Sequence, residues 1–208
     1  MKLKILFLMC SLAIMASRTA HSQEIGMMTD PRDGQVYETF SYENEILGTT
    51  VTWMAQNLNY KMEGSYSAET SGELKKYAGL FYSWYVSREA CPDGWHLPLI
   101  SDWEMLIDQF GGQLEVGAVF KSSVGWYDNG NGDNSSGFNA FPIGKKLIGK
   151  TSIHRLTKEA YFWCSAQTDR SYDKHAVSYY LGYSSKTINR SVHNNDLSFA
   201  MTCRCVKD

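Results

Sequence analysis

The sequence predicts an α+β domain: a mostly antiparallel sheet with two helices and one long loop excursion. Two observations support this fold class. Aromatic content is high, with 13 Tyr and 6 Trp, and chains rich in these residues are usually rich in β structure. Several short β-forming stretches are separated by turn-forming residues, whereas only a few segments have helical periodicity. No repeat or linker interrupts residues 23–208, so we interpret them as one domain.

The first 22 residues have the pattern of a secretory signal peptide. A positively charged start precedes an apolar run at 5–16 and the small-x-small site Ala20-His-Ser22. The run is too short to span a bilayer, and no later segment is long enough, which argues against a transmembrane protein. Cys10 lies inside the run, so we expect it to be removed with the signal rather than lipidated. The predicted location is the periplasm, the cell surface or the extracellular space.

The N-terminal part of the predicted domain has the features of a hairpin. Residues 35–40 and 49–54 are rich in β-branched and aromatic residues and enclose a polar turn at 43–45. Residues 61–76 are polar and irregular, which predicts a surface loop. A dense aromatic run follows at 77–85.

The best specified helix covers residues 101–110. Ser101 is expected to cap it, and Glu104 to close a capping box. Gly111 and Gly112 are expected to end it. Its predicted apolar stripe consists of Trp103, Leu106, Ile107 and Phe110.

The remaining elements are shorter. Residues 83–90 form a helical piece that Pro92 stops, and a second piece covers 114–121. Residues 122–160 are rich in Gly, Asn and Asp, which favours turns and predicts the long loop excursion. Three β signals follow, at residues 161–166, 174–183 and 199–206.

Charge and motifs exclude several classes of function. The net charge is −2 and the charges are scattered, so no basic stripe indicates nucleic acid and no polybasic cluster indicates an anionic membrane. No nucleophile elbow, phosphate loop or dinucleotide fingerprint occurs. Asp102 and Glu104 lie at the start of a predicted helix, where the helix dipole and capping favour acidic residues. We therefore do not interpret them as the acid pair of a glycosidase. His96 is expected to fix a turn by bonding a backbone carbonyl. The sequence therefore predicts no catalytic residue.

Four cysteines follow the signal: Cys91, Cys164, Cys203 and Cys205. An even number in an exported chain favours disulfides, and three pairings are open. Cys203 and Cys205 are two apart on a predicted strand, near the upper distance limit for a bridge, so each should pair with Cys91 or Cys164. The spacing does not resemble a zinc site.

Six motifs occur in a set order along nearly the whole predicted mature chain. They are residues 30–39, 53–60, 91–98 (Cys-Pro-Asp-Gly-Trp-His-Leu-Pro), 137–144, 162–165 and 204–208. Together they resemble the Fibrobacter succinogenes major paralogous domain family. The resemblance implies an exported, often surface-attached protein of Fibrobacteres or Bacteroidetes, from a family whose biochemical role is not established.

A more distant likeness is to C-type-lectin-like folds, including the formylglycine-generating sulfatase-modifying family. The run from Trp95 to Glu104 is similar to that family's entry to a helix, and the terminal Arg-Cys-Val to its closing strand. In the paralogous-domain pattern, positions 91 and 205 are usually cysteine and positions 164 and 203 are not. The resemblance therefore implies a family bridge, Cys91–Cys205, and an added bridge, Cys164–Cys203.

The excursion carries the candidate binding residues. Trp126 and Tyr127 lie among Gly and Asn, which predicts exposed rings that stack on a sugar or fill a partner's pocket. Asp128, Asn131 and Asp133 offer hard oxygen ligands for calcium, although the loop lacks the EF-hand register and an Asx-rich turn is the alternative. Tyr179, Tyr180 and Tyr183 are further candidates for stacking. The other tryptophans are assigned to the core: Trp53, Trp84, Trp95, Trp103 and Trp163.

These features together predict an exported, non-catalytic binding module of the cell envelope. The expected ligand is a glycan or a surface protein, and calcium is the only cofactor that the sequence suggests. One alternative is an enzyme similar to the formylglycine-generating family, whose chemistry uses a reactive cysteine pair. The other is a structural component of the envelope.

Overall fold

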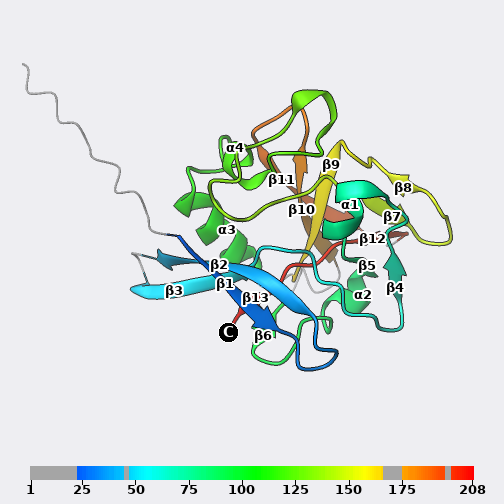
Figure 1. Ribbon diagram of the computed structural model, residues 1–208, viewed down its shortest axis with the longest axis horizontal. Helices are drawn as coiled ribbons and strands as arrows, with labels where there is room; N and C mark the ends of the chain where they lie inside the picture. Colours follow the sequence, from blue (N-terminus) through cyan, green and yellow to red (C-terminus); the bar gives the residue numbers. More distant parts are fainter. Residues whose placement is uncertain (1–22, 45–46, 166–174, 195–197) are drawn as a thin grey trace, which may run out of the picture.

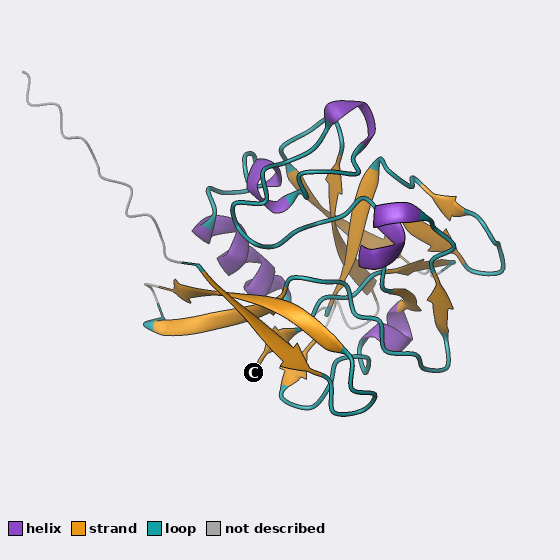
Figure 2. Cartoon of the chain, in the orientation of Figure 1, coloured by secondary structure: helices purple, strands orange, loops and turns teal. Residues whose placement is uncertain are grey.

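The computed structural model describes residues 23–44, 47–165, 175–194 and 198–208. The predicted signal peptide, with Cys10, lies outside them. The described residues form three sheets of antiparallel strands, four short helices and one 3-10 turn (Figures 1 and 2). This confirms the predicted α+β class and its mostly antiparallel pairing. Within these ranges, no helix is both long and apolar enough to cross a membrane.

The first sheet has the strand order β1-β2-β3-β13-β6. The predicted hairpin is confirmed, because β2 (Val36–Asn44) and β3 (Thr49–Met54) pair antiparallel. An additional strand, β1 (Glu24–Thr29), pairs with β2 at the sheet edge. β13 (Val206–Lys207) lies between β3 and β6 (Trp95–His96). Residues from opposite ends of the domain therefore meet in one sheet.

The second sheet has the order β11-β10-β9. The predicted strands at 161–166 and 174–183 correspond to β9 (Glu159–Cys164) and β10 (His175–Gly182). The sequence did not predict β11 (Ile188–Asn194), which pairs antiparallel with β10. Its sequence, Ile-Asn-Arg-Ser-Val-His-Asn, contains only two apolar residues, which is a weak strand signal.

Three predictions fail in the third sheet. The predicted excursion at 122–160 is not loop throughout, because it contains β7 (Lys145–Leu147) and β8 (Ile153–His154). The segment 61–76 is not the expected loop, because it contains a strand and the helix α1 (Gly72–Tyr77). Residues 199–206 are not one strand, because 199–201 pair in the third sheet and 206–207 in the first. The third sheet consists, in order, of β4 (Ser65–Ser67), β5 (Leu80–Ser83), β12 (Phe199–Met201), β7 and β8.

The predicted central helix is α3 (Ile100–Gln109), and its apolar stripe faces the core. The N–H of Leu99 donates to Oδ2 of Asp102 at 2.7 Å. The expected cap is wrong, because Ser101 lies inside the first turn and Asp102 supplies the capping carboxylate. Gly111 and Gly112 follow the C-cap residue Phe110 and end the helix as predicted, with φ of +107° and +86°.

The remaining helical elements are single turns. α2 (Trp84–Ser87) and α4 (Gly117–Phe120) lie within the predicted pieces at 83–90 and 114–121. A 3-10 turn, η1 (Tyr127–Asn129), lies in the loop excursion.

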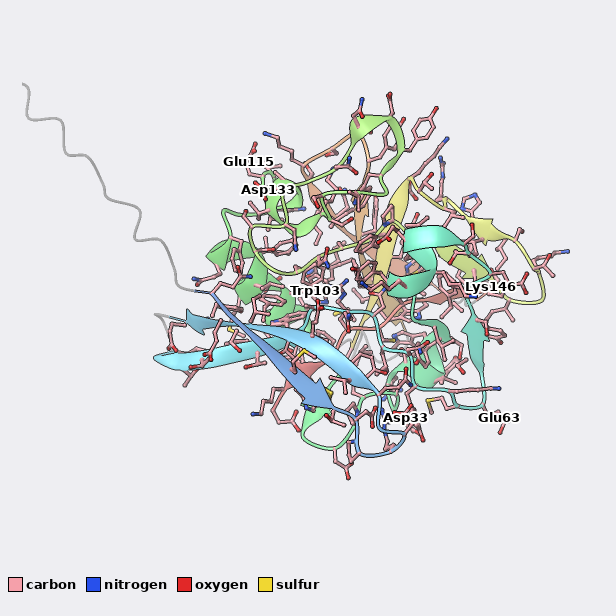
Figure 3. The ribbon with its side chains drawn as sticks, in the orientation of Figure 1. Asp33, Glu63, Trp103, Glu115, Asp133 and Lys146 are labelled. Atoms are coloured by element: carbon pink, nitrogen blue, oxygen red, sulfur yellow. A yellow bond between two sulfur atoms is a disulfide. The ribbon has the colours of Figure 1, made fainter. Side chains whose placement is uncertain are left out.

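Strand β9 separates two groups of core side chains, because alternate residues of a strand point to opposite faces. Phe162 packs with Trp103 and Phe138 in the first core cluster. Trp163 points into the second core cluster. Figure 3 places Trp103 in the interior of the molecule. Of the predicted core tryptophans, Trp53, Trp84, Trp103 and Trp163 are buried, and Trp95 is half-buried.

Candidate functional site

The excursion does not expose Trp126. Its side chain is only 5% exposed, so the prediction of an exposed ring is wrong. The indole Nε1–H donates to Oγ of Ser122 and to the carbonyl of Ala140, both at 3.1 Å. Because the polar atom of the indole has partners inside the excursion, the ring can be buried without an unsatisfied donor. Trp126 therefore stabilises the excursion.

Tyr127 is 49% exposed, as predicted. Its ring meets that of Tyr183 edge-on, with centroids 5.3 Å apart, and the ammonium of Lys158 lies 4.6 Å from its centroid. Its backbone N–H donates to the carbonyl of Thr157 at 2.8 Å. Two surface aromatics, distant in sequence, are thereby held side by side.

A shallow hollow of about 290 Å³ lies beside this pair, and Tyr183 forms part of its lining. Polar groups dominate the rest of the lining, among them Asp128, Asn131 and Lys186. We call Tyr127, Tyr183 and these three residues the tyrosine face.

Lys121 connects the two chain segments of the tyrosine face. This residue is only 3% exposed, and its ammonium donates to the carbonyls of Ser185, Gly182 and Tyr183 at 2.9, 3.2 and 3.4 Å. Burial lowers the pKa of Lys121. Because its carbonyl partners lie around the turn between β10 and β11, Lys121 fixes the excursion against that turn.

The Asp- and Asn-rich loop is folded by its own side chains. Oδ1 of Asn131 accepts the N–H of Trp126 at 3.0 Å, and Oδ1 of Asp133 accepts the N–H of Ser135 at 2.8 Å. Asp128 has a φ of +51°, a conformation that Asp adopts in tight turns. Figure 3 shows Asp133 at the periphery. These are the bonds of the Asx-rich alternative, and calcium binding by the loop stays a prediction.

The predicted bridge between Cys91 and Cys205 is confirmed, with Cα atoms 5.8 Å apart. It joins the segment before β6 to the residue before β13. The bridge thus closes the edge of the first sheet covalently.

The predicted bridge between Cys164 and Cys203 is absent, and both are buried free thiols. The strand register explains this result. Phe162 pairs with Thr202, and the next residues place Cys203 in the second core cluster. Cys164 points into the first core cluster, on the other face of β9. The two thiols therefore face away from each other, and burial raises the pKa of both.

His96 bonds carboxylates rather than the expected backbone carbonyl. Its Nε2 lies 3.0 Å from Oδ2 of Asp102, and its Nδ1 lies 2.6 Å from Oδ1 of Asp208. These hydrogen bonds, that of Asp102 above all, raise the pKa of His96. The ring links β6 to the start of α3 and to the residue after β13.

Arg204 is a buried cation that the sequence did not single out. It is 1% exposed, and it donates to Oδ1 of Asn57 and the carbonyl of Asn139 at 3.0 and 2.9 Å, and to the carbonyl of Phe138. Its guanidinium lies 4.3 Å from the ring centroid of Phe138. Burial lowers the pKa of Arg204 to about 9. These contacts assign Arg204 to the core.

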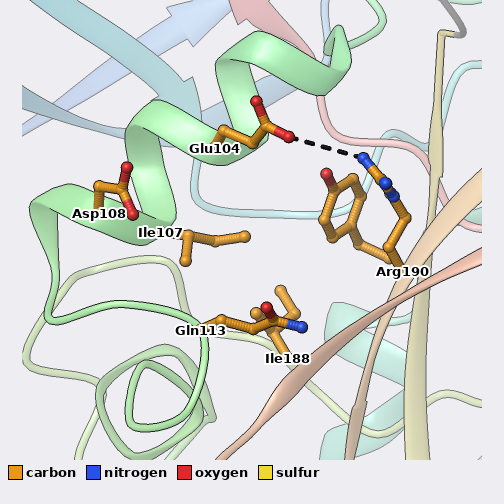
Figure 4. A pocket seen from close by; sticks show the side chains of 7 residues that line it. Glu104, Ile107, Asp108, Gln113, Ile188 and Arg190 are labelled. Atoms are coloured by element: carbon orange, nitrogen blue, oxygen red, sulfur yellow. Dashed lines mark ion pairs between the residues drawn. The ribbon is translucent and has the colours of Figure 1, made fainter.

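A second concave site lies between α3 and β11 (Figure 4). Its volume is about 310 Å³, within the range of small-ligand pockets. The sequence did not predict it, because its two walls are far apart in the chain. We call it the α3–β11 pocket, and its lining consists of Glu104, Ile107, Asp108, Gln113, Tyr179, Ile188 and Arg190.

The rim of the α3–β11 pocket is charged and its floor is apolar. Glu104 does not close the expected capping box; its Oε1 instead lies 3.5 Å from NH1 of Arg190, as the dashed line in Figure 4 marks. Ile107, Ile188 and Tyr179 are almost fully buried beneath this pair. Burial raises the pKa of Tyr179 to about 12, so its phenol stays neutral at physiological pH.

Comparison with known proteins gives one match. A family model, described as the Fibrobacter succinogenes major domain, matches residues 46–207. The matched region contains the tyrosine face, the α3–β11 pocket and both cysteines of the disulfide, whereas β1 and β2 precede it. No curated protein and no solved structure matches the chain.

Proposed function

Since the chain belongs to the Fibrobacter succinogenes major domain family, we propose that it is an exported, non-catalytic binding module of the bacterial cell envelope. Its proposed ligand is a glycan, bound at the tyrosine face. One observation carries the proposal: the exposed Tyr127, in edge contact with the half-buried Tyr183, stands beside a polar hollow. The C-type-lectin-like fold that the distant resemblance implies is part of the same proposal.

The aromatic pair suits the apolar face of a sugar ring. Tyr127 is half exposed, while its edge contact with Tyr183 restrains its rotation. An aromatic ring that is already restrained loses little conformational entropy when a ligand binds. Stacking and burial of sugar C–H groups on such a ring supply affinity without a deep pocket.

The polar hollow suits the hydroxyl groups of a sugar. Asp128 offers hydrogen-bond acceptors, and the side-chain amide nitrogen of Asn131 and the ammonium of Lys186 offer donors. Lys121 holds the underlying backbone in place through its three carbonyl bonds. Because the backbone of the tyrosine face is already fixed, ligand binding costs little conformational entropy for ordering it.

Export agrees with the chemistry of the cysteines. Disulfides such as Cys91–Cys205 persist in oxidising compartments outside the cytosol. The first 22 residues have the pattern of a secretory signal peptide. We therefore propose the periplasm, the cell surface or the extracellular space as its location.

The enzyme alternative has less support. Chemistry similar to that of the formylglycine-generating family uses a reactive pair of cysteines. Here Cys91 and Cys205 are bonded to each other, and Cys164 and Cys203 are buried on opposite faces of β9. The raised pKa of each buried thiol disfavours the nucleophilic thiolate. A structural role in the envelope would instead require self-assembly, which sedimentation of the purified protein measures.

A glycan array probed with the secreted protein tests the proposal, followed by calorimetry on the best ligand. Tyr127→Ala should raise the Kd about tenfold, equivalent to about 1.4 kcal/mol, and leave the thermal midpoint nearly unchanged. Tyr85→Ala is the matched control, because this tyrosine is 65% exposed but lies on α2. Equal effects of the two substitutions, or no glycan bound on the array, would contradict the proposal.

A further inference from the structure

We infer that the α3–β11 pocket binds an aliphatic organic cation, the chemistry of a lysine or arginine side chain. This inference does not depend on the glycan proposal, because it concerns a different surface. It rests on three properties of the pocket: an apolar floor, a rim with one excess negative charge, and a core stack that holds the floor in place before a ligand binds.

The floor accommodates an aliphatic stem. Ile107 is 6% exposed and supplies a small branched apolar surface to the pocket, and Ile188, which is 0% exposed, lines the floor without an accessible surface of its own. The ring of Tyr179 completes the floor and stacks on Trp103, with centroids 4.7 Å apart. Because this stack belongs to the first core cluster, the floor is formed before any ligand arrives.

The rim attracts a cation. Glu104 and Asp108 are four residues apart on α3, so both carboxylates lie on the same side of the helix. Arg190 pairs with Glu104, whereas Asp108 has no ion-pair partner in the part of the chain that the structure describes. Two carboxylates and one guanidinium leave the rim with one excess negative charge.

The same arrangement disfavours the other ligand classes. An anion would have to compete with Glu104 for Arg190 and would then lie near Asp108. A purely apolar ligand would fill the floor but would cover charged groups without satisfying them. An aliphatic cation satisfies both parts, with its stem on the apolar floor at Ile107 and its charge at Asp108.

Asp108 is exposed and has no ion-pair partner in the described ranges, so removing its charge breaks no ion pair of the folded protein. The substitution also removes a like charge four residues from Glu104 on the same helix. Asp108→Asn should therefore weaken ligand binding without lowering the thermal midpoint, a combination that a purely structural role would not produce.

The test is an NMR titration of the full secreted protein with Nα-acetyl-lysine N-methylamide. Amide signals of α3 and β11 should shift. The norleucine analogue, which has the same stem without the ammonium, should bind at least about tenfold more weakly. Asp108→Asn should raise the Kd of the lysine probe about three- to fivefold, the effect of one partly exposed charge. Arg190→Gln should lower the Kd, because it leaves Glu104 unpaired.

Glu115→Gln is the matched control, because Glu115 is an exposed acid that pairs with Lys186 and does not line the pocket. Equal binding of the lysine and norleucine probes would overturn the inference, as would equal effects of Asp108→Asn and Glu115→Gln. Titration with n-pentylamine tests whether the natural ligand is a lysine side chain of a polypeptide or a free amine. Weaker binding of this amine supports a side chain presented by a polypeptide, and equal binding supports a free amine. Tyr127→Ala should leave the titration unchanged, so failure of the glycan proposal would be seen separately.

Discussion

Removing the Cys91–Cys205 bridge is expected to lower the free energy of unfolding by about 4 to 5 kcal/mol. The bridge spans a sequence separation of 114 residues. The chain-entropy relation for a loop of this length gives a loss of about 16 cal/mol/K in the unfolded chain, or about 4.8 kcal/mol at room temperature. The variant is the pair Cys91→Ala and Cys205→Ala, which keeps each Cβ and removes only the sulfur atoms.

Urea denaturation of the oxidised wild-type protein and the paired variant measures this difference. Cys164→Ala and Cys203→Ala are the controls, because each removes one buried sulfur without a bridge. Each control should lose about 1 kcal/mol, the usual cost of a small core deletion. A loss below about 2 kcal/mol in the paired variant would refute the chain-entropy argument. A Cys164–Cys203 peptide in a non-reducing map would refute the assignment of the two thiols to opposite faces of β9.

Three further outcomes are expected. Because the pKa of His96 is raised in the folded protein, its stabilising contribution is complete below its unfolded pKa, near 6.5, and is lost as the pH rises through the folded pKa. The difference in urea midpoint between wild type and His96→Gln should therefore shrink toward alkaline pH; a constant difference would argue against this charge effect. Trp126→Ala should lose about 3 to 5 kcal/mol of stability, as large core deletions do, whereas Tyr127→Ala should change thermal unfolding little; equal midpoints for the two variants would contradict the burial of Trp126. Ellman's reagent should find no reactive thiol in the native secreted protein and both Cys164 and Cys203 after unfolding; a thiol that reacts in the native state would favour the enzyme alternative.

The sequence predicts best where a pattern is local. The stripe of α3 follows from its own periodicity, and the β2–β3 hairpin follows from two β-rich runs around a polar turn. The helix cap was placed two residues too late, because the N-cap is Leu99, which has no capping side chain of its own. Asp102 occupies the position that the prediction gave to Glu104, and it accepts the N–H of Leu99. Local composition identifies the capping residue types but does not fix their register.

The errors arise where a residue's partners are distant or its orientation is unknown. Glycine and asparagine around Trp126 indicate a surface loop, but they do not reveal that Ala140 accepts a bond from the indole. The Cys164–Cys203 bridge fails because the register that places Thr202 beside Phe162 sets which face each thiol occupies. No spacing rule provides that register.

The α3–β11 pocket was missed for a related reason. Glu104 and Arg190 belong to elements that no local pattern joins, and β11 itself gives a weak strand signal. Tyr183 was a candidate for stacking, but its contact with Tyr127 depends on how Lys121 fastens the excursion to the β10–β11 turn. At the tyrosine face the sequence identified the residue types without their neighbours, whereas it did not single out Arg190 or Ile188 of the α3–β11 pocket.

The position of β13 has a consequence for how the chain acquires its structure. Val206 pairs with Trp53 on one side and His96 on the other, so β3 and β6 have no shared neighbour until β13 docks between them. Arg204, two positions earlier, fills the core at the same late stage. Pairings between such distant segments slow folding, because the intervening chain must be ordered first. A folding intermediate should therefore have two unpaired strand edges, those of β3 and β6, until β13 docks between them.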